Sequence, residues 1–156
     1  MERTSKPNIA TLAVDNKRRL INKIRDRNAI ECSNIKILRI DGSLYFGSIE
    51  KISDFLSNLY DQNDIQYVLI AADGINFIDL AAAEWLTHEI ITWQKNRGGI
   101  YFANLKLISQ AVIQKGGFAN KMGDNIFFND KKSAITEIHK LINKPCRVKA
   151  FNECNL

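Results

Sequence analysis

Cysteine and histidine are scarce in this sequence, and their positions argue against metal or disulfide chemistry. The three cysteines (Cys32, Cys146 and Cys154) are scattered, odd in number and form no C-x-x-C pair with a histidine nearby. The two histidines, His88 and His139, stand far apart. We therefore expect no metal site, and free thiols in a reducing compartment.

Long apolar runs are also missing. No stretch approaches the ~20 apolar residues that a membrane-spanning helix needs, and no apolar segment follows the charged N-terminus as in a secretory signal. A chain of 156 residues with 46% apolar and 25% charged side chains has ordinary globular composition. We expect one soluble, cytosolic domain.

The phosphate-binding and nucleophile motifs of common α/β enzymes are absent. The sequence contains no G-x-G-x-x-G, no G-x-x-x-x-G-K-[ST] and no G-x-S-x-G. The most plausible acid–base pair, Asp79 and His88, would lie about 13 Å apart along one helix, too far for direct proton transfer. The sequence therefore predicts no catalytic residues and a protein that is not an enzyme.

The net charge of +5 is concentrated at the N-terminus. Residues 1–36 contain nine basic and four acidic side chains, an excess of five, and the other 120 residues contain 13 of each. Such an asymmetry is typical of a nucleic-acid tail, a membrane-surface segment or a solvated helix face. The charge pattern alone leaves these alternatives open.

From residue 35 onward, strands and helices are predicted to alternate, which favours a parallel sheet with right-handed crossovers. Residues 15–31 fit either a short amphipathic helix or an irregular connection, and Asp41-Gly42 and Asp73-Gly74 have turn chemistry. Strands are expected at residues 8–14, 35–40, 67–72, 100–104 and 126–128, and helices from Ser48 and at 79–96, 107–115 and 133–143. The predicted fold is α/β, a mostly parallel sheet with an N-terminal edge strand, flanked by about four to five α-helices.

Asp79 stands where the longest helix begins. Its carboxylate is predicted to accept hydrogen bonds from first-turn amides and to favour the positive end of the helix dipole. Ala81, Ala82 and Ala83 keep that turn slim. An N-cap with tight packing is sufficient to explain this segment.

Three motifs in order nevertheless resemble the STAS domain, found in anti-sigma-factor antagonists and at the C-terminus of SulP-type anion transporters. They are Gly42-Ser43-Leu44-Tyr45-Phe46, the segment from Ile78-Asp79 to Glu84-Trp85-Leu86, and Gly117-Phe118 before an Ile-Phe strand. The resemblance covers residues 7–143 and is greater to the transporter branch. It implies a STAS core at 35–143, preceded by a basic juxtamembrane segment and edge strand at 1–34 and followed by a tail at 144–156.

One departure distinguishes the two branches. Anti-sigma-factor antagonists carry a phosphorylatable serine or threonine directly after the aspartate, whereas this sequence has Leu80. A side chain without a hydroxyl excludes phosphorylation at this position. The resemblance thus implies a regulatory domain without this phospho-switch.

The resemblance to transporters also gives the basic segment an interpretation. A segment that leaves the last membrane span on the cytoplasmic side is favoured to be basic by topology and by anionic lipids. The chain would then be part of a longer membrane protein of the sulfate, bicarbonate or dicarboxylate class, at the cytoplasmic face of the plasma (inner) membrane. Its partners would be the transmembrane domain of the same polypeptide, the membrane surface through the basic segment, and a homodimer or cytosolic protein, but not nucleic acid. The alternative is a free-standing partner-switch protein that resembles an anti-sigma-factor antagonist.

The expected binding surface lies after the strands of the parallel sheet, where α/β proteins generally bind ligands. Phe46, which lies close by in sequence, is expected in the core. No cofactor is expected, apart from weak nucleotide binding at the helix start. The predicted ligand- or partner-binding residues are Ser43, Tyr45, Asp73, Asn76, Phe77, Asp79 and Leu80.

Overall fold

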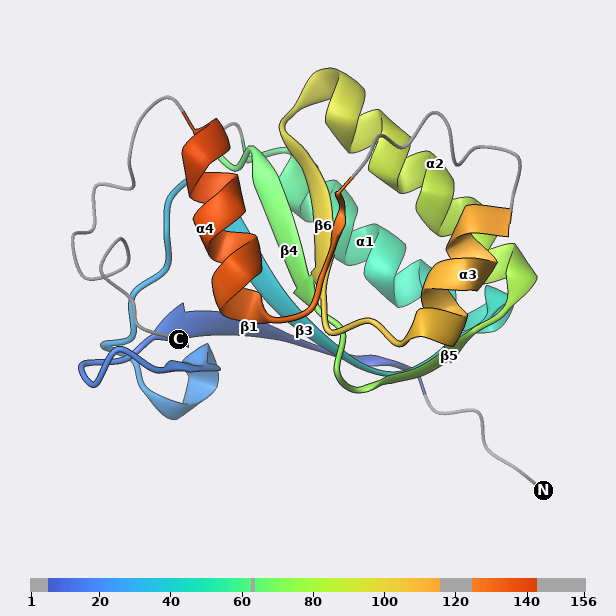
Figure 1. The fold of residues 1–156 in the computed structure, drawn as a ribbon. Helices are drawn as coiled ribbons and strands as arrows, with labels where there is room; N and C mark the ends of the chain where they lie inside the picture. The colour runs from blue at the N-terminus through green and yellow to red at the C-terminus, as the bar shows by residue number, and fades with distance from the viewer. Residues whose placement is uncertain (1–5, 63, 116–124, 143–156) are drawn as a thin grey trace.

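The computed structural model describes residues 6–62, 64–115 and 125–142 (Figure 1), which contain seven strands and four α-helices. The strands are β1 (Asn8–Val14), β2 (Leu20–Asn22), β3 (Ile35–Leu44), β4 (Tyr67–Ala71), β5 (Ile75–Ile78), β6 (Gly99–Ala103) and β7 (Phe127–Phe128). The helices are α1 (Ile49–Tyr60), α2 (Leu80–Asn96), α3 (Leu107–Lys115) and α4 (Lys131–Leu141), with single 3₁₀ turns η1 (Lys23–Arg25) and η2 (Phe46–Ser48). The predicted α/β fold is confirmed. No described helix has both the length and the hydropathy to cross a membrane.

The sheet has the order β2-β1-β3-β4-β6-β7, with β5 paired to β3 outside this path. β3, β4, β6 and β7 are parallel, and β1 is antiparallel to both β3 and β2. The central strand β4 is almost entirely apolar because both of its faces are covered. The predicted parallel sheet is confirmed.

The strand alternation divides the core into two layers. Leu38, Ile40 and Val68 point toward α1, α2 and α3, whereas Ile35 and Ile37 point toward α4 and the N-terminal segment. Figure 1 shows α4 alone on its face of the sheet. This placement leaves the carboxyl ends of β3, β4 and β6 bordered by the starts of α2 and α3.

Arg97, which follows α2, ties α2 to the turn after α1. Its guanidinium donates hydrogen bonds to the backbone carbonyls of Tyr60, Gln62 and Ile65. It also lies 4.7 Å from the Tyr60 ring centroid and 5.8 Å from that of Trp93. A single side chain therefore satisfies the carbonyls where α1 ends.

The N-terminal region differs from the sequence-based expectation. β1 exists, but the three-residue strand β2 pairs with its Leu12–Val14 part and is the outermost strand. Residues 15–31 contain β2, η1 and a bridge between Val14 and Ile30, so the amphipathic helix is wrong and the irregular connection is right. Helical spacing of Leu20, Ile21 and Ile24 was misleading because pairing with β1 determines the conformation.

Other boundaries also differ. β3 does not turn at Asp41-Gly42 but continues to Leu44, with Gly42 at a φ of 120° against Pro7. α4 begins at Lys131, because Asp130 rather than Ser133 is its N-cap. Ser48 precedes α1 without capping it through its side chain. The predicted tail at 144–156 and the Gly117-Phe118 motif lie outside the described residues.

Candidate functional site

The predicted site lies at the carboxyl ends of β3 and β4, where two segments of the chain are joined by backbone hydrogen bonds. The Gly42 amide donates to the Gly74 carbonyl (2.8 Å), and the Asp79 amide donates to the Leu44 carbonyl (2.9 Å). These bonds flank β5, a strand that the sequence did not reveal, which pairs in parallel with the end of β3. The expected loop at 73–79 is therefore a fixed extension of the sheet.

Asp79 connects the two segments through its side chain. One carboxylate oxygen accepts the Ala82 amide (2.8 Å), which confirms the predicted N-cap of α2. The other accepts the Phe46 amide at 3.3 Å. The negatively charged carboxylate thus already occupies the α2 N-terminus, which opposes binding of a nucleotide phosphate there.

Around Asp79 the surface is apolar. Phe77 is 48% exposed, Leu80 65% and Phe46 71%, so the expectation that Phe46 belongs to the core is wrong. Ile75 and Ile78 fill the core in its place, because β5 adds a further apolar layer beside Leu44. Large side chains this exposed and this close together are typical of an interaction surface.

The first turn of α3 extends the same end of the domain. Leu107 is 81% and Ile108 72% exposed, and α3 contacts both α2 and β5 (Figure 1). The sequence analysis missed these two residues. The signal was available, because at about 100° per residue Leu107 and Ile108 lie roughly 120° and 140° around the helix from the buried Ile113. We call Phe46, Phe77, Leu80, Leu107 and Ile108 the apolar surface.

The remaining predicted site residues surround this surface without forming a pocket. Asp73 is exposed and accepts a hydrogen bond from Asn104 Nδ2 (3.2 Å), which links the ends of β4 and β6, and Asn76 is exposed on β5. Ser43 and Tyr45 are half-buried, and their carbonyls accept from the Ser48 hydroxyl at 3.3 and 2.8 Å. These contacts position the turn before α1.

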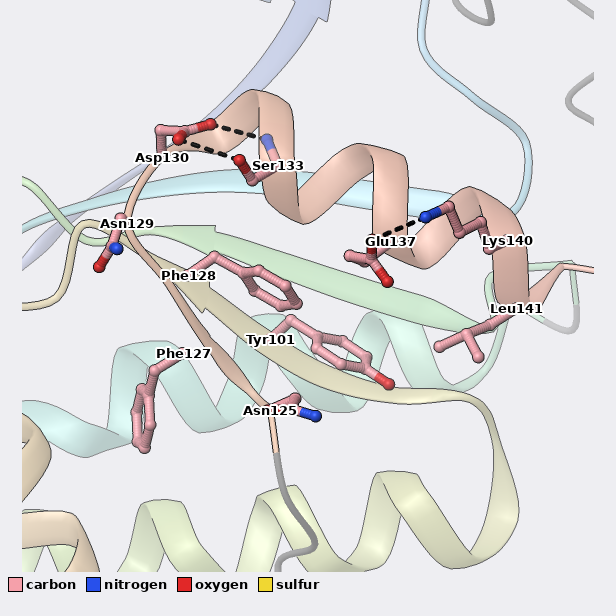
Figure 2. Close-up of a pocket in the computed structure, with 10 residues that line it drawn as sticks. All are labelled: Tyr101, Asn125, Phe127, Phe128, Asn129, Asp130, Ser133, Glu137, Lys140 and Leu141. Carbon is pink, nitrogen blue, oxygen red and sulfur yellow. Dashed lines mark hydrogen bonds and ion pairs between the residues drawn. The ribbon is translucent and has the colours of Figure 1, made fainter.

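A hollow of about 690 Å³ lies on the other face of the sheet, between α4 and the β6–β7 edge (Figure 2). The rings of Tyr101 and Phe128 form its floor, and burial raises the pKa of the Tyr101 phenol. Its polar rim is satisfied within α4, for example by the Glu137–Lys140 ion pair at 2.9 Å. None of the predicted site residues lines it.

Potential metal-binding side chains do not cluster in the described residues. Among them, no three histidine, cysteine, aspartate or glutamate side chains lie close enough together to hold a metal ion. The carboxylate at the predicted site, Asp79, is bound to two backbone amides.

A mostly parallel sheet extended by β5, with a capped helix and an apolar surface at its carboxyl end, places the protein in the α/β class. The STAS domain family model matches residues 26–134, well over half of the chain. The chain therefore belongs to the STAS domain family. No curated protein sequence matches it significantly.

Solved structures of two kinds share the fold. The murine solute carrier 26 family member A9 (Slc26a9) anion transporter has a TM-score of 0.73 at 21% identity, covering 86% of this chain and 22% of the transporter chain. A second SLC26A9 structure has a TM-score of 0.72 at 18% identity, covering 86% of this chain and 24% of the other. The unphosphorylated anti-sigma factor antagonist SpoIIAA has a TM-score of 0.56 at 16% identity, covering 73% of this chain and 96% of SpoIIAA. The chain thus spans less than a quarter of the transporters it resembles.

Proposed function

We propose that this chain is the regulatory interaction domain of a SulP-type transporter for inorganic anions of the sulfate or bicarbonate kind. It acts by docking and has no catalytic role. It works at the cytoplasmic face of the plasma (inner) membrane, with the transmembrane domain of the same polypeptide as its partner. The observation that carries the proposal is the position of the apolar surface beside the entry of the chain.

The chain enters next to the apolar surface. Pro7 is buried against Gly42, and Lys6 lines a hollow together with Gly47 and Ser48, directly after Phe46. A domain joined upstream of Lys6 would therefore be tethered on the side of the domain where Phe46 lies. A short tether gives such a partner a high effective concentration, so that modest apolar contact is sufficient for docking.

The chemistry of Leu80 supports a docking surface that phosphorylation does not switch off at this residue. Leu80 is the first residue of α2 and is 65% exposed, so it offers apolar area and no hydroxyl. Phe77 lies three residues earlier on β5, on the other side of Asp79. Contacts that include both would bury two large, exposed apolar side chains at this end of the sheet, which favours association.

One alternative retains support. The match to the anti-sigma factor antagonist SpoIIAA takes in 96% of the SpoIIAA chain, so a partner-switch protein of this fold without a transporter part is the alternative. In that case the same apolar surface would bind a cytosolic protein partner or a second copy of the chain. The reading frame upstream of Met1 separates the alternatives, because a transporter requires a series of membrane-spanning segments there.

The decisive experiment uses the membrane domain encoded upstream, reconstituted in nanodiscs, with this chain added in trans. Amide hydrogen exchange should slow at Phe46, at residues 77–80 and at 107–108. Leu80→Glu should abolish this protection without unfolding the domain, since an acidic residue in the first turn favours the helix dipole. Leu141→Ser, an exposed leucine on α4, is the matched control and should leave protection intact. Protection confined to other surfaces, or an effect of Leu141→Ser equal to that of Leu80→Glu, would refute the proposed docking.

A further inference from the structure

A second exposed feature lies at the other end of β1, in the connection from Asp15 to Glu31, which we call the basic loop. It consists of the turn after β1, the short strand β2 and the 3₁₀ turn η1. Its basic side chains outnumber its acidic ones by six to three. The exposed basic residues are Lys17, Arg18, Arg19, Arg25 and Arg27.

The three acids of the basic loop are less exposed than five of its six basic side chains, and Asp15 pairs with Arg19 at 3.0 Å. Asp15 is only 6% exposed and accepts the Lys17 and Arg19 amides at 3.0 and 2.7 Å, and the hydrogen bond from the Arg19 amide is the main reason that its pKa is lowered. Glu31 lies between Lys23 (2.6 Å) and Lys36 (2.8 Å). Asp26 is half-buried and accepts the Asn28 amide. The loop therefore presents to solvent a surface whose charges are positive.

An isoleucine protrudes from this positive surface. Ile24, at the centre of η1, is 89% exposed, the highest value among the large apolar side chains of the described residues. Lys23 and Arg25 are its direct neighbours. Asn22 accepts the Ile24 amide (3.1 Å), so the backbone is held while the side chain projects. Nothing in the fold of the domain requires an apolar side chain at this tip.

Basic residues around a protruding apolar side chain fit an anionic lipid surface. The basic groups attract lipid headgroups, and an aliphatic side chain is stabilised when it leaves water for the acyl boundary. A nucleic acid would use the charges but offers no burial to an isoleucine tip, and it is usually read by aromatic stacking. The combination therefore favours a membrane.

The position of the basic loop in the domain agrees with membrane binding. β1 forms one edge region of the domain, with the chain entry at Pro7 at its start and the basic loop at its end (Figure 1). The seven residues of β1 span about 20 Å, so one flat surface can contact both ends. From these observations we infer that the basic loop is a lipid-binding site, in which Ile24 inserts between anionic phospholipid headgroups that Lys17, Arg25 and Arg27 contact. The inference rests on the proposed function in that this function places the chain beside a membrane.

The test is binding of this chain to phosphatidylcholine vesicles with and without phosphatidylglycerol, measured by co-sedimentation. Binding should require phosphatidylglycerol and weaken as salt is added. Arg25→Gln with Arg27→Gln should weaken it roughly 30-fold, from about fivefold per charge near an anionic surface. Ile24→Ser should weaken it about tenfold through lost insertion, and Ile24→Trp should strengthen it.

Matched controls remove the same groups elsewhere. Lys95→Gln with Lys115→Gln deletes two exposed charges on α2 and α3, and Leu141→Ser removes an exposed leucine. Both should leave vesicle binding unchanged. The inference is overturned if the chain does not bind the anionic vesicles, if Ile24→Ser and Ile24→Trp bind like the wild type, or if single-stranded RNA displaces the vesicles with an affinity insensitive to residue 24. Failure here with intact protection in the nanodisc experiment would refute the lipid site alone, whereas the opposite result would refute docking alone.

Discussion

Replacement of Asp79 separates its structural role from the contacts of the apolar surface. The side chain caps α2 through the Ala82 amide and holds the η2 turn through the Phe46 amide. Loss of a cap costs about 1 kcal/mol. Loss of a long, half-exposed charged hydrogen bond and of the charge at the helix start adds about 1 kcal/mol more. Asp79→Ala is therefore expected to lower the free energy of unfolding by about 2 kcal/mol.

Two further variants separate the cost of losing the cap from the cost of losing the Phe46 hydrogen bond and the charge. Asp79→Ser retains a capping oxygen but is too short to reach Phe46, so it should cost about 1 kcal/mol. Asp79→Asn keeps one acceptor oxygen for the Ala82 amide, but its Nδ2 is a donor and cannot accept from the Phe46 amide, so with the charge also lost it should cost about 1 kcal/mol. In Asp79→Ser, the Phe46 amide should exchange faster while the Ala82 amide stays protected.

The assay is urea denaturation followed by tryptophan fluorescence, with amide exchange on the same variants. With a slope of about 2 kcal/mol per molar urea, Asp79→Ala should lower the midpoint by about 1 M. The reasoning is refuted if Asp79→Ala unfolds within about 0.5 kcal/mol of the wild type, or if Asp79→Ser releases both amides equally.

Three other predictions concern stability. Arg97→Met should lower the free energy of unfolding by about 2 to 3 kcal/mol, and Arg97→Lys by about half of that, because lysine cannot donate to three carbonyls at once. Urea midpoints check this, and equal losses for the two variants would contradict it. Burial raises the pKa of Glu89, so the folded state loses stability as pH rises above the ordinary pKa of a glutamate. Glu89→Gln should therefore gain stability at pH 7 and little at pH 4, as thermal melts at both pH values would show. Burial lowers the pKa of His139 from 6.5, so the folded state should lose stability as pH falls below that value, and His139→Gln should flatten this part of the stability profile.

The local pattern of the sequence was sufficient for the central elements. The apolar run at β4 and the three- and four-residue spacing of Leu86, Ile90 and Trp93 in α2 each follow from burial against a sheet. The Asp79 cap was predictable for the same reason, because a capping side chain bonds to amides only a few residues away. The exclusion of phosphorylation at residue 80 was also predictable, since the absence of a hydroxyl is a property of leucine itself.

Tertiary structure decided the features that depend on distant partners. β2 and β5 are too short to be recognised alone and exist because β1 and β3 offer them hydrogen bonds. β3 continues through Asp41-Gly42 for the same reason. The exposure of Phe46 depends on Ile75 and Ile78, about thirty residues later, which fill the space that Phe46 was expected to occupy. The sequence therefore determined the central elements and the family resemblance, whereas the apolar surface and the low exposure of the acids in the basic loop required the packed fold, because exposure is a property of neighbours in space.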